Sequence, residues 1–91
     1  MTQEQDAKYN RFHSLYEKVL EKYAEAHRAI TFGSELQEAA VVSYTLYATS
    51  FKNWVKSDKF LSTQSGTKHA CQMATAAIDA LTLQRENMKE F

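Results

Sequence analysis

Four side chains that can ligate metals follow one another at four-residue steps in the first third of the chain: His13, Glu17, Glu21 and Glu25. On a helix, residues four apart are neighbours on one face, so a shared metal ion is conceivable there. Di-iron carboxylate bundles instead place a Glu-x-x-His on each of two helices, and no glutamate lies three residues before His13 or His27. Lys18 and Lys22 interleave with the glutamates, which is typical of a solvated face crossed by weak ion pairs. We therefore expect no metal and no cofactor.

Cys71 and His69 are the next pair of residues that could take part in catalysis, Cys71 as a nucleophile and His69 as its base. Residues two apart on a helix point about 200° away from each other, which disfavours such a pair. Cys71 is the single cysteine, so it cannot form an internal disulfide, and no Cys/His zinc spacing accompanies it. We expect no catalytic residues and predict that the chain is not an enzyme.

A basic cluster with one tryptophan lies around the end of the second third of the chain: Lys52, Trp54, Lys56 and Lys68. Lysines beside the free N–H groups of a following helix could hold a phosphate or carboxylate. Lysines near a helix C-terminus also complement the helix dipole without binding anything. The cluster is therefore a candidate anion site, with the dipole explanation as its alternative.

The elements that position these residues are marked by two glycines and by the absence of proline. Gly33 and Gly66 divide the chain into nearly equal thirds. Gly33 is placed to end a helix in the left-handed conformation, and Ser34 with Gln37 has the spacing of a capping box that opens the next helix. Near the second break, either Ser65 or Thr67 is a candidate cap for a third helix.

Hydrophobic periodicity predicts a helix in each third. The first third carries an unbroken heptad pattern: Tyr9, Phe12, Tyr16, Val19, Tyr23, Ala26 and Ile30. Leucines on both flanks widen this stripe, which favours a bundle over a two-stranded coil. The last third presents a ridge of small residues, Ala70, Ala74 and Ala77, that permits close helix approach.

The middle third contains thirteen uncharged residues, 39–51, AAVVSYTLYATSF. Its β-branched and aromatic content suits a strand, but a lone strand has nothing to pair with. We therefore predict a second helix whose inner face is broad: Leu36, Ala40, Val41, Tyr44, Tyr47, Ala48, Phe51, Trp54 and Val55. The expected fold is all-α, a three-helix up-down-up antiparallel bundle with helices at about 3–30, 34–60 and 67–90, forming one domain over residues 1–91.

Val42 and Leu46 fall on the far side of the second helix, beside Ala39 and Asn53, where a surface helix normally carries charge. Isolated surface hydrophobes are common and need no explanation. Adjacent ones form a patch, however, and we predict that these four residues form an interface with a second copy or with another protein.

Three tyrosines, Tyr9, Tyr16 and Tyr23, belong to the first heptad stripe. Aromatic residues with one polar end are enriched at protein interfaces, so we predict that these three line a groove between the first helix and a docked partner. The alternative is that they sit at the rim of the core with their hydroxyls in water.

Charge and composition limit the classes of partner that this chain could bind. Eleven basic and eleven acidic residues cancel, and each third is balanced, so no basic face suits nucleic acid. No apolar run approaches the ~20 residues of a membrane span. We expect a cytoplasmic, homodimeric, non-catalytic interaction module: an adaptor, regulator or inhibitor of a larger protein. The alternative is a small-ligand binder that captures a nucleotide or other anion at the basic end near Trp54 and Lys68.

Overall fold

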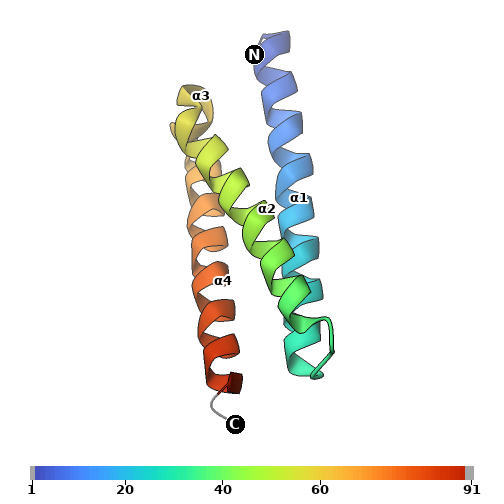
Figure 1. Ribbon diagram of the computed structural model, residues 1–91. Coiled ribbons are helices and arrows are strands. Elements are labelled where there is room, and N and C mark those ends of the chain that lie inside the picture. Colours follow the sequence, from blue (N-terminus) through green and yellow to red (C-terminus); the bar gives the residue numbers. More distant parts are fainter. Residues whose placement is uncertain (1, 90–91) are drawn as a thin grey trace.

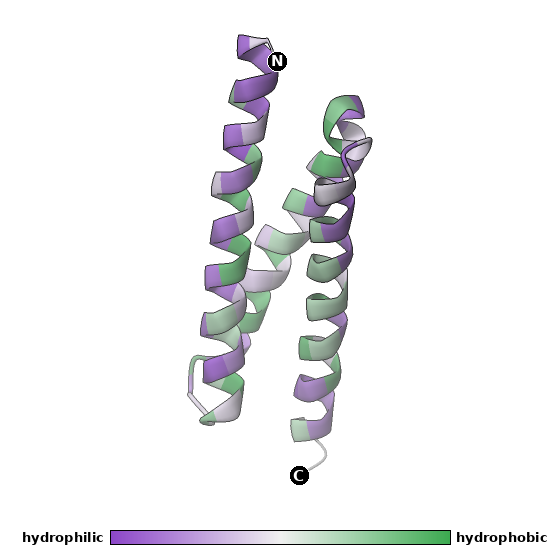
Figure 2. Ribbon diagram, turned by 180° about the vertical axis from the view of Figure 1, so that it is seen from behind, coloured by the Kyte–Doolittle hydropathy of each residue, from purple (hydrophilic) through white to green (hydrophobic). Residues whose placement is uncertain are grey.

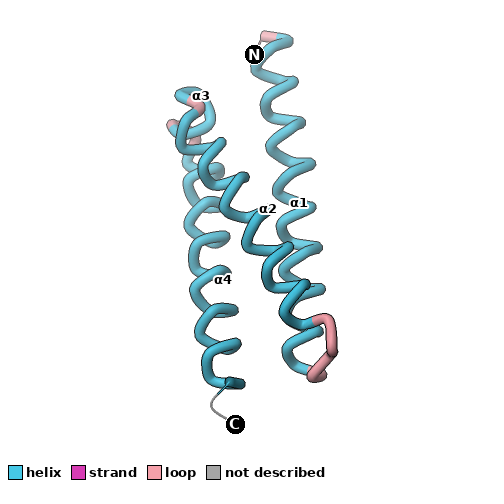
Figure 3. The backbone as a smooth tube through the Cα atoms, in the orientation of Figure 1, coloured by secondary structure: helices cyan, strands magenta, loops and turns pink. Residues whose placement is uncertain are grey.

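The computed structural model describes residues 2–89, and its regular elements are all helices: α1 (Gln3–Thr31), α2 (Gln37–Ser57), α3 (Lys59–Ser62) and α4 (Ser65–Lys89). The chain runs down along α1, returns along α2 and descends again along α4 (Figure 1). The result is a rod of 52 × 17 × 15 Å. Short loops join the helices (Figure 3).

The all-α prediction is confirmed, whereas the three-helix bundle is not, because the described residues form four helices. The helix expected over residues 34–60 starts three residues late and is divided at Asp58, whose backbone is extended with φ −89° and ψ 114°. The carboxylate atom Oδ1 of Asp58 accepts hydrogen bonds from the backbone N–H groups of Phe60 (3.0 Å) and Leu61 (3.1 Å). This cap opens the four-residue helix α3 and redirects the chain toward α4.

The turn after α1 has the predicted glycine geometry but not the predicted cap. Gly33 is left-handed with φ 64°, and the N–H of Ser34 donates to the carbonyl of Ala29 (2.9 Å), as in a Schellman motif. The capping box of Ser34 and Gln37 is wrong. The hydroxyl of Ser34 accepts from the N–H of Leu36 (3.1 Å), and α2 begins at Gln37 without a side-chain cap.

At the second break α4 begins at Ser65. Thr67 is not a cap, because it is buried and its hydroxyl donates instead of accepting. Its partners are the carbonyls of Gln64 (2.7 Å) and Leu61. These bonds tie the first turn of α4 to the end of α3.

The core lies where α2 packs against both α1 and α4. Tyr44 and Ala48 of α2, Ala26 of α1 and Leu61 of α3 are fully buried. Two residues expected on the inner face of the second helix are exposed: Leu36 precedes α2 and is 70% exposed, and Tyr47 lies at the α1–α2 edge. Seen from behind, the apolar sides of α1 and α4 turn toward each other in front of α2 (Figure 2).

Candidate interaction surfaces

The outer side of α2 carries an uncharged strip, which we call the outer stripe: Ala39, Val42, Leu46 and Asn53. All four residues are exposed. Val42 retains 46% and Leu46 65% of its accessible surface, although α2 packs against two other helices. The stripe contains the apolar side chains that the sequence placed on the far side of this helix.

The three interface tyrosines line a different surface, two neighbouring hollows between α1 and α4 that share Tyr16 and that we together call the α1–α4 cleft. Its upper part, about 260 Å³, is lined by Tyr9, His13, Tyr16 and His69 among others. Its lower part, about 360 Å³, is lined by Tyr16, Leu20, Tyr23, Met73 and four alanines, Ala74, Ala76, Ala77 and Ala80, among others. The hydroxyl of Tyr16 donates across the cleft to the sulfur of Met73 (3.9 Å).

The residues predicted as one partner interface therefore lie on two opposite faces. Helix α2, whose outer side carries the stripe, lies in front of α1 and α4 in Figure 1. In the reverse view, α1 and α4 stand nearest (Figure 2). The residues that line the cleft belong mainly to these two helices. The tyrosines and the outer stripe cannot touch the same partner segment.

Small side chains explain why the cleft is open. The alanines of α4 reach only a short way toward α1, so Leu20 and Met73 on the two walls each remain 44% exposed. From the sequence, we predicted that the alanine ridge packs closely against a neighbouring helix. The sequence did not lead us to predict an exposed surface formed by Leu20, Met73, Ala76 and Ala80. The signal for it was the contrast between large side chains on the first helix and alanines on the last.

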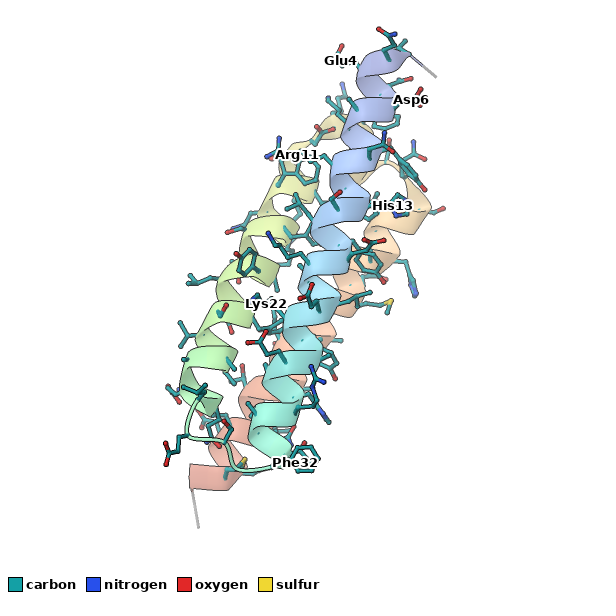
Figure 4. All side chains as sticks on the ribbon, turned by 90° about the vertical axis from the view of Figure 1, so that its right-hand side faces the viewer. Glu4, Asp6, Arg11, His13, Lys22 and Phe32 are labelled. Carbon is teal, nitrogen blue, oxygen red and sulfur yellow. The ribbon has the colours of Figure 1, made fainter. Side chains whose placement is uncertain are left out.

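A third hollow, about 520 Å³, separates α1 from α2 and is edged by cations. The guanidinium of Arg11 lies 4.9 Å from the ring centre of Trp54, and Lys18 lies 5.5 Å from that of Tyr47. Figure 4 shows Arg11 and Lys22 on the side of α1 that faces α2, whereas His13 points to the other side. These cation–π contacts cover aromatic rings that would otherwise be bare.

The structure only partly assembles the candidate anion site. Lys56 and Lys68 line one groove of about 640 Å³ between α2 and α4, together with Ser62 and the opposing carboxylate of Asp79. Trp54 lines the α1–α2 hollow instead, under Arg11. Lys52 does not line the groove of Lys56 and Lys68.

The residues considered for catalysis or metal binding do not come together in the fold. Cys71 is buried beside the α2–α4 groove, whereas His69 is exposed and lines the upper cleft. Within residues 2–89 no three His, Cys, Asp or Glu side chains come close enough to hold a metal ion.

The surroundings shift the pKa values of Tyr44 and Asp58. Burial in the core raises the pKa of Tyr44 to about 12, because the phenolate form would lose its water. The backbone N–H of Leu61 lowers the pKa of Asp58, and the ammonium of Lys8, 3.2 Å from Oδ2, lowers it further. Both groups fix the fold, Tyr44 between α2 and α4 and Asp58 at the α2–α3 junction.

Comparisons with known proteins found no matching family model, no similar curated protein and no similar solved structure. Among the described residues, no helix has the length and apolar character needed to cross a membrane.

Proposed function

We propose that this chain is a small non-catalytic protein–protein interaction module that associates with itself through the outer stripe of α2. The role is that of an adaptor, regulator or inhibitor of a larger protein. A homodimer is the smallest assembly of this kind.

The exposure of Val42 and Leu46 carries the proposal. The two side chains lie one helical turn apart, on a segment with no charge between residues 39 and 51. Adjacent exposed apolar side chains mark interaction sites, because association removes them from water at roughly 25 cal/mol per Å². Cation–π contacts shield the aromatic rings on the neighbouring α1–α2 edge, whereas Leu46, at the rim of the same hollow, keeps 65% of its surface exposed.

Gel filtration coupled to light scattering tests the proposal. We expect a mass above that of one chain, 10.4 kDa, that rises with protein concentration. A mass of one chain across the whole concentration range would contradict self-association and leave only a foreign partner.

A second candidate function is capture of a nucleotide or another anion. It is favoured by one observation, that Lys56 and Lys68 line the same groove. A ligand that binds the folded state must raise the melting temperature. Thermal melts with nucleotides and inorganic phosphate therefore test this candidate, and an unchanged midpoint with every anion would eliminate it.

A further inference from the structure

We propose that the α1–α4 cleft binds a straight-chain fatty acid, with its carboxylate in the upper part between His13 and His69 and its alkyl tail in the lower part. No residue of the outer stripe lines the cleft, so the inference goes beyond self-association and does not depend on it. The site is also distinct from the α2–α4 groove, which Lys56 and Lys68 line.

One contact fixes the register of the two walls of the cleft. The hydroxyl of Tyr16 on α1 lies 3.9 Å from the sulfur of Met73 on α4, and the two helices run in the same direction (Figure 1). His13 and His69 each precede this contact by one helical turn, and both line the upper part of the cleft. The two imidazoles therefore lie at about the same level on opposite walls.

Below this contact the walls are apolar. Leu20 and Tyr23 follow on α1, and Ala77 and Ala80 follow on α4, again at steps of about one turn. The remaining residues that line the lower part are valine, tyrosine and alanine, so its lining contains no charged side chain. A space of about 360 Å³ with such walls favours an alkyl chain and disfavours a charged group, which would lose its water there.

The upper part of the cleft is lined by groups that can donate hydrogen bonds. Tyr9, Gln64, His13 and His69 contribute a hydroxyl, an amide and two imidazoles, and the lining contains no carboxylate. An imidazole can donate when neutral and donates more strongly when protonated. This lining therefore suits an anionic oxygen, which accepts such bonds and meets no negative charge there.

The hydroxyl of Tyr16 stands where the two parts meet, because Tyr16 lines both of them. Within the chain it donates to the thioether of Met73, which is a weak acceptor. A carboxylate oxygen is a much stronger acceptor. A fatty acid in the cleft therefore gives Tyr16 a stronger hydrogen bond than the one it makes within the chain.

The length of the cleft selects the length of the tail. Ala80, the last alanine of the lower part, follows His69 by eleven residues. Eleven residues of helix span about 16 Å. An extended dodecanoyl chain has a similar length, so dodecanoate should fill the cleft, whereas hexanoate should leave its lower end empty.

Isothermal titration calorimetry tests the inference with four probes below their micelle concentrations: hexanoate, octanoate, decanoate and dodecanoate. We expect the affinity to rise about two- to fourfold with each added methylene, as burial of the tail requires. Dodecanol should bind about tenfold more weakly than dodecanoate, because it lacks the charge that strengthens the hydrogen bonds of the head. An affinity independent of chain length would overturn the inference, and so would equal affinities for dodecanol and dodecanoate.

The position of the carboxylate is tested by a double variant, His13→Gln with His69→Gln. Both positions are exposed, so the variant should fold, and the single variants repeat the test if circular dichroism shows that it does not. We expect dodecanoate to bind about tenfold more weakly and dodecanol to bind as before. His27→Gln is the matched control, since His27 is exposed on α1 and lines neither part of the cleft. Equal losses for the two probes would contradict the placement of the carboxylate.

The position of the tail is tested by Ala80→Trp, which fills the lower end of the cleft. Dodecanoate should then bind about tenfold more weakly, whereas hexanoate, which does not reach Ala80, should be unaffected. Ala7→Trp is the matched control, at an exposed position of α1 outside the cleft. Leu20→Glu, which places a charge beside the tail, repeats the test if Ala80→Trp does not fold. Unchanged binding of dodecanoate by the folded variant would overturn the inference.

Leu46→Lys separates the cleft from the outer stripe, which also exposes apolar side chains. Binding of dodecanoate should be unchanged in this variant, whether or not its mass in light scattering changes. Loss of binding in Leu46→Lys, with full binding in Ala80→Trp, would place the fatty acid on the stripe and overturn the inference. Absence of dodecanoate binding to the wild type would overturn the inference alone, because self-association is judged by the mass.

Discussion

The hydroxyl of Tyr44 on α2 donates a hydrogen bond to the backbone carbonyl of Ala74 on α4, at 3.4 Å in the fully buried core. A buried tyrosine hydroxyl needs a partner, and a backbone carbonyl on the alanine-rich face of α4 can accept its hydrogen bond. This bond therefore fixes where α2 crosses α4.

Removal of that hydroxyl by Tyr44→Phe should cost about 0.5–1.5 kcal/mol in the free energy of unfolding, the typical net contribution of one hydrogen bond. Urea denaturation followed by circular dichroism measures the change. Because the bond is long, we expect a value near the lower limit. A stabilised variant would show that the hydroxyl is not satisfied in the fold.

Tyr44 also gives a pH dependence. Its pKa is raised from 10.0 to about 12 in the folded chain, so the folded state holds the phenol proton more tightly than the unfolded state. The contribution is fully present below pH 10 and is lost as pH rises through 12. The free energy of unfolding of the wild type should therefore fall relative to that of Tyr44→Phe over this alkaline interval, until the variant is the more stable of the two, and a constant difference would contradict the assignment.

Asp58→Ala should destabilise the chain by about 0.5–2 kcal/mol, because it removes the N-cap of α3. Asp58→Asn is the matched variant, since its amide oxygen keeps the cap while the pair with Lys8 is lost. The lowered pKa of Asp58 means that its charge stabilises the fold above the ordinary aspartate range and that this is lost as pH falls through the folded pKa. Chemical denaturation of wild type and Asp58→Asn between pH 7 and 3 should show the two curves converging in acid.

Phe51→Ala should cost about 3–5 kcal/mol, because it opens a cavity between α1 and α2. The ring of Phe51 is 2% exposed and lies 5.3 Å from that of Phe12. Phe32 is the control, since it is 81% exposed and its change to alanine should alter stability by less than about 0.5 kcal/mol. Equal losses in urea denaturation of the two variants would place the core elsewhere.

Leu46→Lys should leave the free energy of unfolding of the monomer within about 0.5 kcal/mol of wild type, since Leu46 is 65% exposed. Its effect should appear in the mass measured by light scattering, because a lysine on the outer stripe must be dehydrated on association. Ser14 is exposed on α1, and the control Ser14→Lys should change neither quantity. Unfolding of the Leu46→Lys variant would mean that Leu46 belongs to the core.

Much of the local structure could be read from the residues. The heptad of α1 predicted its helix, and Gly33 predicted the turn that follows, because a left-handed backbone is easiest for glycine. The spacing of Val42 and Leu46 predicted that both would point away from the inner face of α2, since helical period fixes direction within one helix.

The division at Asp58 could not be predicted in the same way. An aspartate in this position fits a helix interior, a C-terminus or an N-cap, and only the course of the chain toward α4 selects the cap. Likewise Tyr47 has the period of a core residue but is exposed, because α1 passes to one side of it.

The sequence by itself determined that the chain is helical and how each side chain points around its own helix axis. Tertiary structure alone decided that Tyr16 and Tyr23 line an open cleft with Met73 between α1 and α4. The reason is physical: periodicity sets angles within one helix, whereas the distance between two helices depends on how the side chains of both fill the space between them. Alanines on α4 leave that space open, and no pattern within a single segment specifies this.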